Sequence, residues 1–332
     1  MNEFELISRL TRSLPTNKSV VVGAGDDCAV LDLGVADKLF LFKTDAVVEG
    51  IHFTKETPPE KIGRKSLARA LSDIAAMAGT PQHALITLGL PRDFDLAFIE
   101  KIYAGMAELA HQHGVAIVGG ETTTNPVILL NIALLGFAPR GKCVLRSGAE
   151  VGDAIFVTGE LGGSLAGRHL EFEPRLAEAR WLAEHFPPHS MIDLSDGLAG
   201  DLKHILNASK VGAELLTRSI PISRAAKELS RSRVRENADA ATESQPRSHE
   251  RGYESSRKPA LLAALTDGED FELLFTLAAK DAVPLLDAWK KQFPEVKLTC
   301  IGKITAGSGL ALRDGRGVMP FTGQGYTHFA PS

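Results

Sequence analysis

The sequence predicts a two-domain protein of mixed α/β and α+β architecture. Its 332 residues are enough for two domains that each bury a core. The first 140 residues alternate apolar strands with two long amphipathic helices, which is typical of a sheet covered by helices. A second series of strands and helices opens near Gly152. We therefore expect an N-terminal domain over residues 1–140 and a C-terminal α+β domain over residues 141–332.

The elements of the N-terminal domain follow from the spacing of apolar residues. Helices are expected where these residues recur every three or four positions, over residues 3–14, 59–78 and 95–113. Gly79 is a favourable stop for the second of these helices. Strands are expected over residues 20–22, 29–33, 39–44, 84–89, 115–118 and 127–137.

The same reasoning divides the C-terminal domain into strands and helices. Strands are expected over residues 154–158, 191–194, 211–216, 273–277, 296–304 and 309–313. Helices are expected over residues 173–186 and 280–292, and from the Ser195-Asp196-Gly197 turn to about residue 208.

Residues 230–259 differ in composition from the rest of this domain. They are rich in Ser, Arg and Glu and contain almost no large aliphatic side chains. Such a segment buries too little apolar surface to offset its ordering entropy, so we predict a mobile surface insertion. A nucleic-acid-binding arm is the alternative, but acidic residues occur throughout the segment.

Composition excludes several classes of partner. The formal net charge of −4 gives no general attraction to nucleic acid or to an anionic membrane. No window reaches the roughly 18 apolar residues of a membrane span, and Glu3 and Glu5 interrupt the N-terminal apolar stretch. Cys28, Cys143 and Cys300 are far apart and are expected to be reduced thiols. We therefore expect a cytoplasmic protein with no nucleic-acid or membrane partner.

Carboxylates gather at predicted strand ends and turns. Ligand sets made only of oxygen suit Mg²⁺ or Mn²⁺ rather than Zn²⁺, and Mg²⁺ usually binds a few carboxylates together with substrate phosphates. The carboxylates are Asp26, Asp27, Asp45, Glu49, Asp73, Glu121, Asp193, Asp196, Glu269 and Asp270.

Each of these residues also has an ordinary structural interpretation. Asp26 and Asp27 follow glycine, as turn residues often do. Asp73 lies four residues after Arg69, which allows an ion pair along one helix face. Asp196 could be the N-cap or a first-turn acid of the next helix. Only the joint occurrence of these residues with glycine-rich turns favours a shared site.

Two glycine-rich segments are candidates for phosphate contacts. Residues 119–124 (GGETTT) follow a short apolar strand, and residues 159–164 (GELGGS) precede an expected helix. Glycine lets backbone N–H groups approach a phosphate. Neither segment matches the P-loop or the dinucleotide-binding pattern, so those two enzyme classes are disfavoured.

Taken together, the ordered motifs resemble those of the thiamine-monophosphate kinase family. The superfamily also contains aminoimidazole ribonucleotide synthetase and selenophosphate synthetase, although the N-terminal Cys-Lys segment of the latter is absent here. The matching segments are residues 25–30 (GDDCAV), 44–53 (TDAVVEGIHF), 71–77 (LSDIAAM), 119–123 (GGETT), 146–149 (RSGA), 152–153 (GD), 157–159 (VTG), 192–198 (IDLSDGL), 268–273 (GEDFEL) and 325–329 (GYTHF).

The resemblance implies a specific architecture and reaction. A synthetase-like N-terminal domain would dimerise through its sheet, and ATP with several Mg²⁺ ions would lie between this domain and the C-terminal α+β domain. The γ-phosphate would pass in line to thiamine monophosphate, giving thiamine diphosphate. A related kinase or synthetase with another small acceptor, or a catalytically weak nucleotide-binding homologue, are the alternatives.

The resemblance also assigns roles to individual positions. Metal ligands would be Asp27, Thr44, Asp45, Asp73, Glu121, Asp193 and Asp196. Nucleotide contacts would be Tyr103, Gly120, Glu121, Arg146 and Ser195. Substrate contacts would be His52, Glu269 and Tyr326, with a packed imidazole as the alternative for His52. No covalent catalytic residue is expected, because phosphoryl transfer depends mainly on positioning and charge neutralisation.

Four positions depart from the family pattern. Glu121 and Gly163 stand where the family has Asp, and Asp267 stands where it has Gly. Lys43 stands beside the expected metal ligands, where the family often has a small or acidic residue. Its ammonium group could replace part of the metal charge or could point into solvent.

Overall fold

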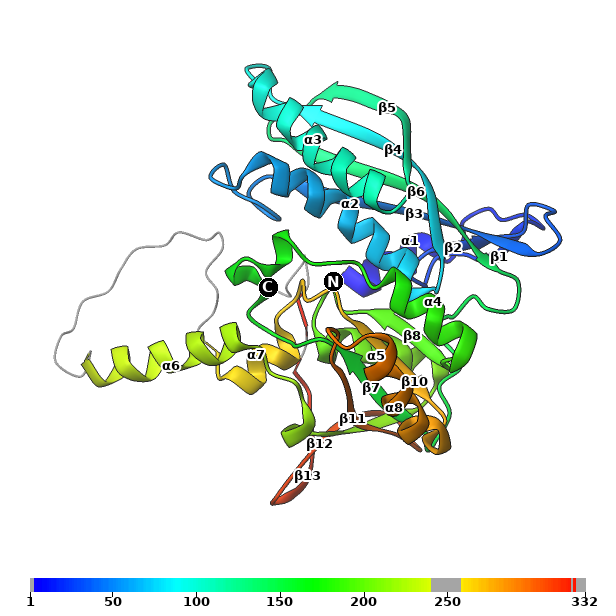
Figure 1. The fold of residues 1–332 in the computed structure, drawn as a ribbon, viewed down its shortest axis with the longest axis vertical. Coiled ribbons are helices and arrows are strands. Elements are labelled where there is room, and N and C mark those ends of the chain that lie inside the picture. The colour runs from blue at the N-terminus through cyan, green and yellow to red at the C-terminus, as the bar shows by residue number, and fades with distance from the viewer. Residues whose placement is uncertain (1–2, 240–257, 324, 327–332) are drawn as a thin grey trace.

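The chain folds around two β-sheets, each with its own helices (Figure 1). The structure is a computed structural model that describes residues 3–239, 258–323 and 325–326. This arrangement confirms the predicted mixed fold with two sheet-based parts. The last strand of the first sheet ends at Pro139 and the first strand of the second begins at Ala154.

The first sheet has six strands in the order β1-β2-β3-β6-β4-β5. Its strands are β1 (Val20–Val22), β2 (Ala29–Leu31), β3 (Lys38–Val48), β4 (Thr80–Leu90), β5 (Ala116–Thr124) and β6 (Leu129–Pro139). Neighbouring strands are antiparallel except β4 and β5, which are parallel. The accompanying helices are α1 (Glu3–Thr11), α2 (Pro59–Ala76) and α3 (Leu96–Gln112).

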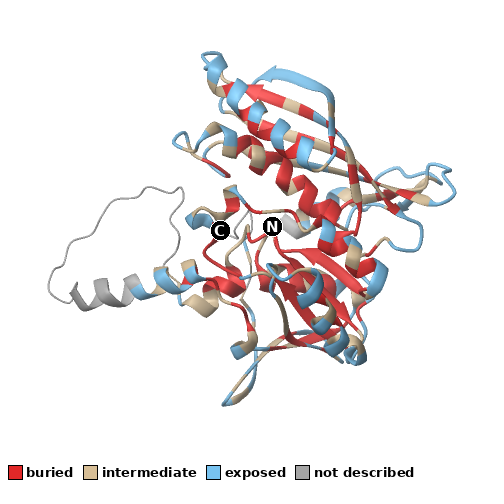
Figure 2. Ribbon diagram, viewed as in Figure 1, coloured by how far each residue is buried: buried red, intermediate tan, exposed pale blue. Residues whose placement is uncertain are grey.

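Helices α2 and α3 pack together beside this sheet, and α2 is almost entirely buried (Figure 2). On β6, Leu130, Ile132 and Leu134 are buried while the residues between them remain partly exposed, as the two-residue period of a strand requires. Gly63 of α2 and Gly105 of α3 lie against the backbone of the opposite helix, where a Cβ atom would overlap it. The absence of side chains at these two positions lets the helices cross at close range.

The opposite face of the first sheet carries uncovered apolar side chains. Phe42 and Leu85 are 50% and 47% exposed. Leu135 lies opposite Phe42 in the β3–β6 pair, and Ala133 lies between Thr44 and Leu85 across β3, β6 and β4. Cross-strand partners share a face, so these residues form one partly apolar surface. We call it the open face.

The second sheet has seven strands in the order β13-β12-β9-β11-β7-β10-β8. Its strands are β7 (Ala154–Thr158), β8 (Ser190–Asp193), β9 (Gly212–Leu216), β10 (Leu273–Leu277), β11 (Leu298–Thr305), β12 (Gly309–Asp314) and β13 (Gly317–Pro320). Its helices are α4 (Leu176–His185), α5 (Leu198–Ser209), α6 (Arg224–Asp239), α7 (Ala260–Thr266) and α8 (Ala282–Gln292).

The central strands of this sheet are buried on both faces. On β7, Phe156 packs in the same hydrophobic core as α2, whereas Ile155 and Val157 pack in a second core with α5. Strands covered on both faces are buried at every position and mostly apolar, which is the pattern of β7 and β10. The shared core joins the two sheets through α2.

Several predicted boundaries differ from the structure. Strand β5 continues through residues 119–124, which we predicted as a phosphate-binding turn. Two short 3₁₀ helices, residues 164–166 and 168–170, follow the other glycine-rich turn instead of an α-helix. The insertion predicted over residues 230–259 begins inside α6, and residues 240–257 lie outside the described ranges. In those ranges, no helix combines the length and hydrophobicity needed to cross a bilayer.

Candidate active site

Strand β3 and helix α2 face each other with two oppositely directed ion pairs. The Lys43 ammonium lies 2.6 Å from Asp73 Oδ1, and the Arg69 guanidinium donates two hydrogen bonds of 3.1 Å to Asp45. Residues two apart on a strand share a face, and so do residues four apart on a helix. Lys43 and Asp45 therefore face Asp73 and Arg69 as two neighbouring ion pairs, which we call the β3–α2 ladder. The alternative interpretation of Asp73, an ion pair with Arg69 along one helix face, is therefore wrong, because Asp73 is buried and pairs with Lys43.

Three buried carboxylates meet beside this ladder. Asp27 comes from the turn before β2, Asp73 from α2, and Asp193 from the end of β8. Each offers a ligand atom, and these atoms all lie within 4.8 Å of one another. We call this group the carboxylate cluster. It brings together three of the predicted metal ligands from both sheets.

Cations and a hydroxyl group contact most of this cluster. The Arg146 guanidinium donates to Asp27 Oδ1 at 2.5 Å, and Ser72 Oγ donates to Asp193 Oδ2 at 2.6 Å. The second Asp27 oxygen, Oδ2, is buried and has no hydrogen-bond partner among the described residues. A buried carboxylate oxygen without a donor is costly unless a cation contacts it.

The electrostatics of the cluster favour an added cation. Burial raises the pKa of Asp193 to about 7, and the nearby Asp27 carboxylate contributes to this rise. Burial also raises the pKa of Asp73; Lys43 opposes this shift, while Asp193 and Asp45 add to it. Crowded carboxylates therefore resist ionisation until positive charge is supplied. Their all-oxygen chemistry and the unpaired Asp27 oxygen fit Mg²⁺.

A second group of possible ligands lies at the start of α5. Asp196, Asp201 and His204 offer ligand atoms within 4.8 Å of one another. The Asp196 N–H donates to Asp201 Oδ2 at 3.1 Å. The N-cap of α5 is Gly197, so the N-cap interpretation of Asp196 is wrong. We did not predict Asp201 or His204, although their helical spacing directly after the Ser-Asp-Gly turn was a usable signal.

Lys65 links two of the predicted substrate positions. Its side chain is fully buried, and Nζ lies 2.7 Å from the His52 carbonyl oxygen, 2.8 Å from His169 Nδ1 and 2.7 Å from Glu269 Oε2. The His52 ring is itself buried, and its Nδ1 accepts the Val48 N–H at 3.1 Å. A single lysine on α2 thus joins His52 to Glu269. Neither Lys65 nor His169 was predicted from the sequence.

These contacts shift the pKa values of the linked groups. Burial would raise the pKa of Glu269, but the hydrogen bond to His169 and the charges of Lys65 and Arg69 lower it to about 2. Burial lowers the pKa of Lys65 to about 8, with Glu269 opposing the shift. Burial and the nearby Arg69 charge lower the pKa of His52 to about 4.

Three loop segments close around these groups. The Glu269 N–H donates to the Ser195 carbonyl at 2.7 Å, and the Tyr326 N–H donates to the Asp196 carbonyl at 2.8 Å. A Cβ atom on Gly268 would overlap the Ser195 carbonyl, so this approach requires glycine. Ser195, Asp196, Glu269 and Tyr326 are therefore neighbours, as a shared site requires.

Other predicted residues lie apart from the carboxylate cluster within one chain. Glu121 on β5 lies opposite Thr87 on β4, and Thr87 lies opposite Asn131 on β6. Asn131 in turn lies opposite Ala46 on β3. Three strand spacings, about 14 Å, therefore separate Glu121 from Ala46. Tyr103 lies on α3, and Gly120 lies next to Glu121 on β5. Thr44 projects onto the open face and donates to Asn131 Oδ1 at 2.9 Å.

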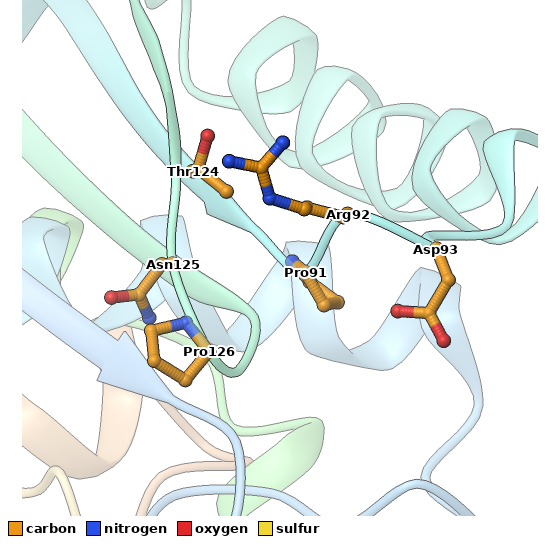
Figure 3. Close-up of a pocket in the computed structure, with 6 residues that line it drawn as sticks. All are labelled: Pro91, Arg92, Asp93, Thr124, Asn125 and Pro126. Carbon is orange, nitrogen blue, oxygen red and sulfur yellow. The ribbon is translucent and has the colours of Figure 1, made fainter.

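A surface pocket at the ends of β4 and β5 contains none of the predicted site residues. It has a volume of about 390 Å³ and is lined by Pro91, Arg92, Asp93, Thr124, Asn125 and Pro126 (Figure 3). Its lining comes from one end of the sheet and the following turns, so it does not join the two ligand groups.

Two of the departures from the family pattern contact each other. The Gly163 N–H donates to Asp267 Oδ2 at 3.3 Å, and Lys258 Nζ donates to the other oxygen at 3.1 Å. The Asp267 carboxylate therefore joins the turn at Gly163 to Lys258.

Comparisons with known proteins show the family of the chain. Residues 25–138 match the family model "AIR synthase related protein, N-terminal domain". The thiamine-monophosphate kinase of Rhodopirellula baltica is 39% identical over 90% of this chain and 87% of its own. That of Escherichia coli K12 is 35% identical over 99% of this chain and 98% of its own.

Solved structures show the same relationship. AaThiL complexed with AMPPCP and TMP aligns over 99% of this chain and 97% of its own, with 28% identity and a TM-score of 0.77. Thiamine-monophosphate kinase from Stenotrophomonas maltophilia aligns over 93% of this chain and 96% of its own, with 31% identity and a TM-score of 0.69. The chain belongs to the thiamine-monophosphate kinase family.

Proposed function

We propose that this ATP-dependent thiamine-monophosphate kinase transfers the γ-phosphate in line, with Mg²⁺ held by the carboxylate cluster. The observation that carries the proposal is the meeting of Asp27, Asp73 and Asp193 within 4.8 Å, with one buried Asp27 oxygen unpaired. Bound Mg²⁺ would neutralise charge on the β- and γ-phosphates. Asp45, adjacent on the β3–α2 ladder, and Asp196, beside the second ligand group, would supply further ligands.

The residues of the chain would position the two reactants. Arg146 would contact phosphate oxygens through its planar guanidinium, from a position against Asp27. His52, Glu269 and Tyr326 would line the acceptor site, held in place by Lys65 and by the backbone bonds to Ser195 and Asp196. The acceptor phosphate is already anionic near neutral pH, so no strong general base is needed.

We also propose that the enzyme is a homodimer in the cytoplasm. A second copy packed on the open face would cover Phe42 and Leu85, which are about half exposed. Because Glu121 is separated from the carboxylate cluster within one chain, the predicted nucleotide contacts on β5 and α3 would serve the site of the second copy. The cytoplasm is where ATP is available and where free cysteines such as Cys28 persist.

The direct test measures ADP release and thiamine diphosphate formation together. We expect both products in equal amounts from ATP and thiamine monophosphate, with activity lost on chelation of divalent ions and restored by Mg²⁺. Formation of free phosphate without thiamine diphosphate would contradict transfer to this acceptor. Full activity in the presence of a chelator would contradict the metal role of the cluster.

A further inference from the structure

Lys43 directs its ammonium group into the carboxylate cluster. Nζ lies 2.6 Å from Asp73 Oδ1, and the side chains of Lys43 and Asp73 are only 25% and 10% exposed. The sequence left open whether Lys43 points toward the predicted metal ligands or into solvent. In the structure it points toward the predicted metal ligands. The position on β3 explains this, since Lys43 shares a face with the buried Leu41.

The charges around the cluster show what this ammonium does. When ionised, Asp27, Asp73 and Asp193 carry three negative charges, and Lys43 and Arg146 supply two positive charges by direct contact. The Lys43 ammonium contacts Asp73, whereas Asp27 keeps one buried oxygen without a donor. The oxygens available to a divalent ion are thus on the Asp27 side, and the Asp73 side already has a cation.

We propose that the Lys43 ammonium is a built-in cation that takes the place of one divalent ion at Asp73. The chain would then bind one divalent ion fewer than the same chain with a small side chain at position 43. A compact ammonium with three donors can sit against one carboxylate oxygen as a point charge. This inference rests on the proposed metal role of the cluster.

Counting bound Mn²⁺ tests the inference. The bound ions would be counted by electron paramagnetic resonance in the presence of a non-hydrolysable ATP analogue, for the unmodified protein and for Lys43→Ser and Lys43→Met. We expect one additional Mn²⁺ per chain in Lys43→Ser, because serine leaves both the space and an oxygen ligand. The control is Lys38→Met on the same strand. The Lys38 ammonium lies 4.0 Å from the centre of the Phe137 ring, so the number of bound Mn²⁺ ions should not change in this variant.

The outcomes separate this inference from the proposed function. An unchanged Mn²⁺ count in a folded Lys43→Ser would overturn the inference. Asp27→Asn tests the cluster itself: if it binds as many ions as the unmodified protein, the proposed metal role fails, whatever Lys43 does.

The unmodified protein provides a test that needs no variant. Crystals grown with Mn²⁺ and the ATP analogue would locate each ion by anomalous scattering. We expect the Lys43 ammonium to remain on Asp73, with an ion beside Asp27. An ion bound to Asp73 Oδ1 with Lys43 turned away would overturn the inference even if the Lys43 variants fail to fold.

Discussion

Lys65 Nζ lies 2.7 Å from Glu269 Oε2, although 204 positions separate the two residues in the chain. Lys65 belongs to α2, which packs beside the first sheet. Glu269 lies shortly before β10 of the second sheet. The pair therefore links the two sheets beside the proposed acceptor site. Because the Lys65 side chain is fully buried, removing the Glu269 charge leaves a buried ammonium without a carboxylate partner.

Acid should weaken the protein through Glu269. Its pKa of about 2 lies below the ordinary value of about 4.3, so its ionised form stabilises the fold above about pH 4 and this contribution is lost as the pH falls toward 2. The shift corresponds to about 3 kcal/mol. Glu269→Gln should lower the free energy of unfolding near neutral pH and flatten its acid dependence. Denaturant unfolding at several pH values measures both.

Glu171→Gln is the matched control for this change. Glu171 pairs with Lys61 at 2.9 Å, but its side chain is 59% exposed. Exposed pairs contribute little to stability, so this variant should keep the acid dependence of the unmodified protein. Equal effects of the two substitutions would argue against a special role for the Lys65–Glu269 pair.

Asp73→Asn should reduce turnover by orders of magnitude in a folded protein. The substitution keeps the shape of the side chain but removes charge from the carboxylate cluster, on which the transition state depends. Asp45→Asn should behave in the same way. Steady-state kinetics with circular dichroism separates catalysis from folding.

A helix cap supplies the contrasting case. Asp95 accepts the Ala97 N–H at the start of α3 and is not one of the cluster residues. Asp95→Ala should cost about 1 kcal/mol of stability and leave turnover unchanged. Normal turnover in Asp73→Asn would refute its contribution to the carboxylate cluster.

Mg²⁺ should stabilise the protein more at about pH 8 than at about pH 6. Without metal, the pKa of Asp193 is raised to about 7, so the folded protein binds more protons than the unfolded chain between about pH 4 and 7. Stability without metal therefore falls as the pH rises through this window. Bound metal replaces the proton on Asp193, so the stability of the folded protein no longer falls as the pH rises. Thermal unfolding with and without Mg²⁺ measures the difference, and Asp27→Asn should abolish it.

Mixing two inactive variants should restore activity if the site spans two copies. Asp27→Asn alters the carboxylate cluster, and Glu121→Gln alters the exposed β5 edge. In a mixed dimer one site would have both residues intact, giving about a quarter of normal activity after random reassociation. Light scattering should show twice the protomer mass of 35.6 kDa. A monomer, or no recovery in a dimer, would contradict the shared site.

Much of the fold was predictable because hydrophobic spacing reports local burial. The strands at residues 154–158 and 273–277 were placed at the residues where the structure has them. The length of β5 was missed because Gly119 and Gly120 are poor strand residues; a side chain on Gly120 would overlap the Ile86 carbonyl of the neighbouring strand. The glycine that suggested a phosphate turn is required by sheet packing.

The site was predictable only where a motif marked it. Asp27, Asp73 and Asp193 were identified from motifs, and the structure brings them together. Lys65 was missed because a lysine within an amphipathic helix usually points to solvent, and its burial depends on partners more than 100 positions away. Sequence periodicity carries no information about such distant partners.

Because Gly163 and Asp267 are in contact, the residue types that fit at one position depend on the residue at the other. Reverting Asp267→Gly alone would leave the Gly163 N–H and the Lys258 ammonium without this acceptor. Reverting Gly163→Asp alone would add a second carboxylate and force a Cβ atom against the Ala226 backbone, at a φ of +69° that disfavours side chains. The effect of a substitution at either position is therefore expected to depend on the residue at the other, although 104 positions separate the two in the chain.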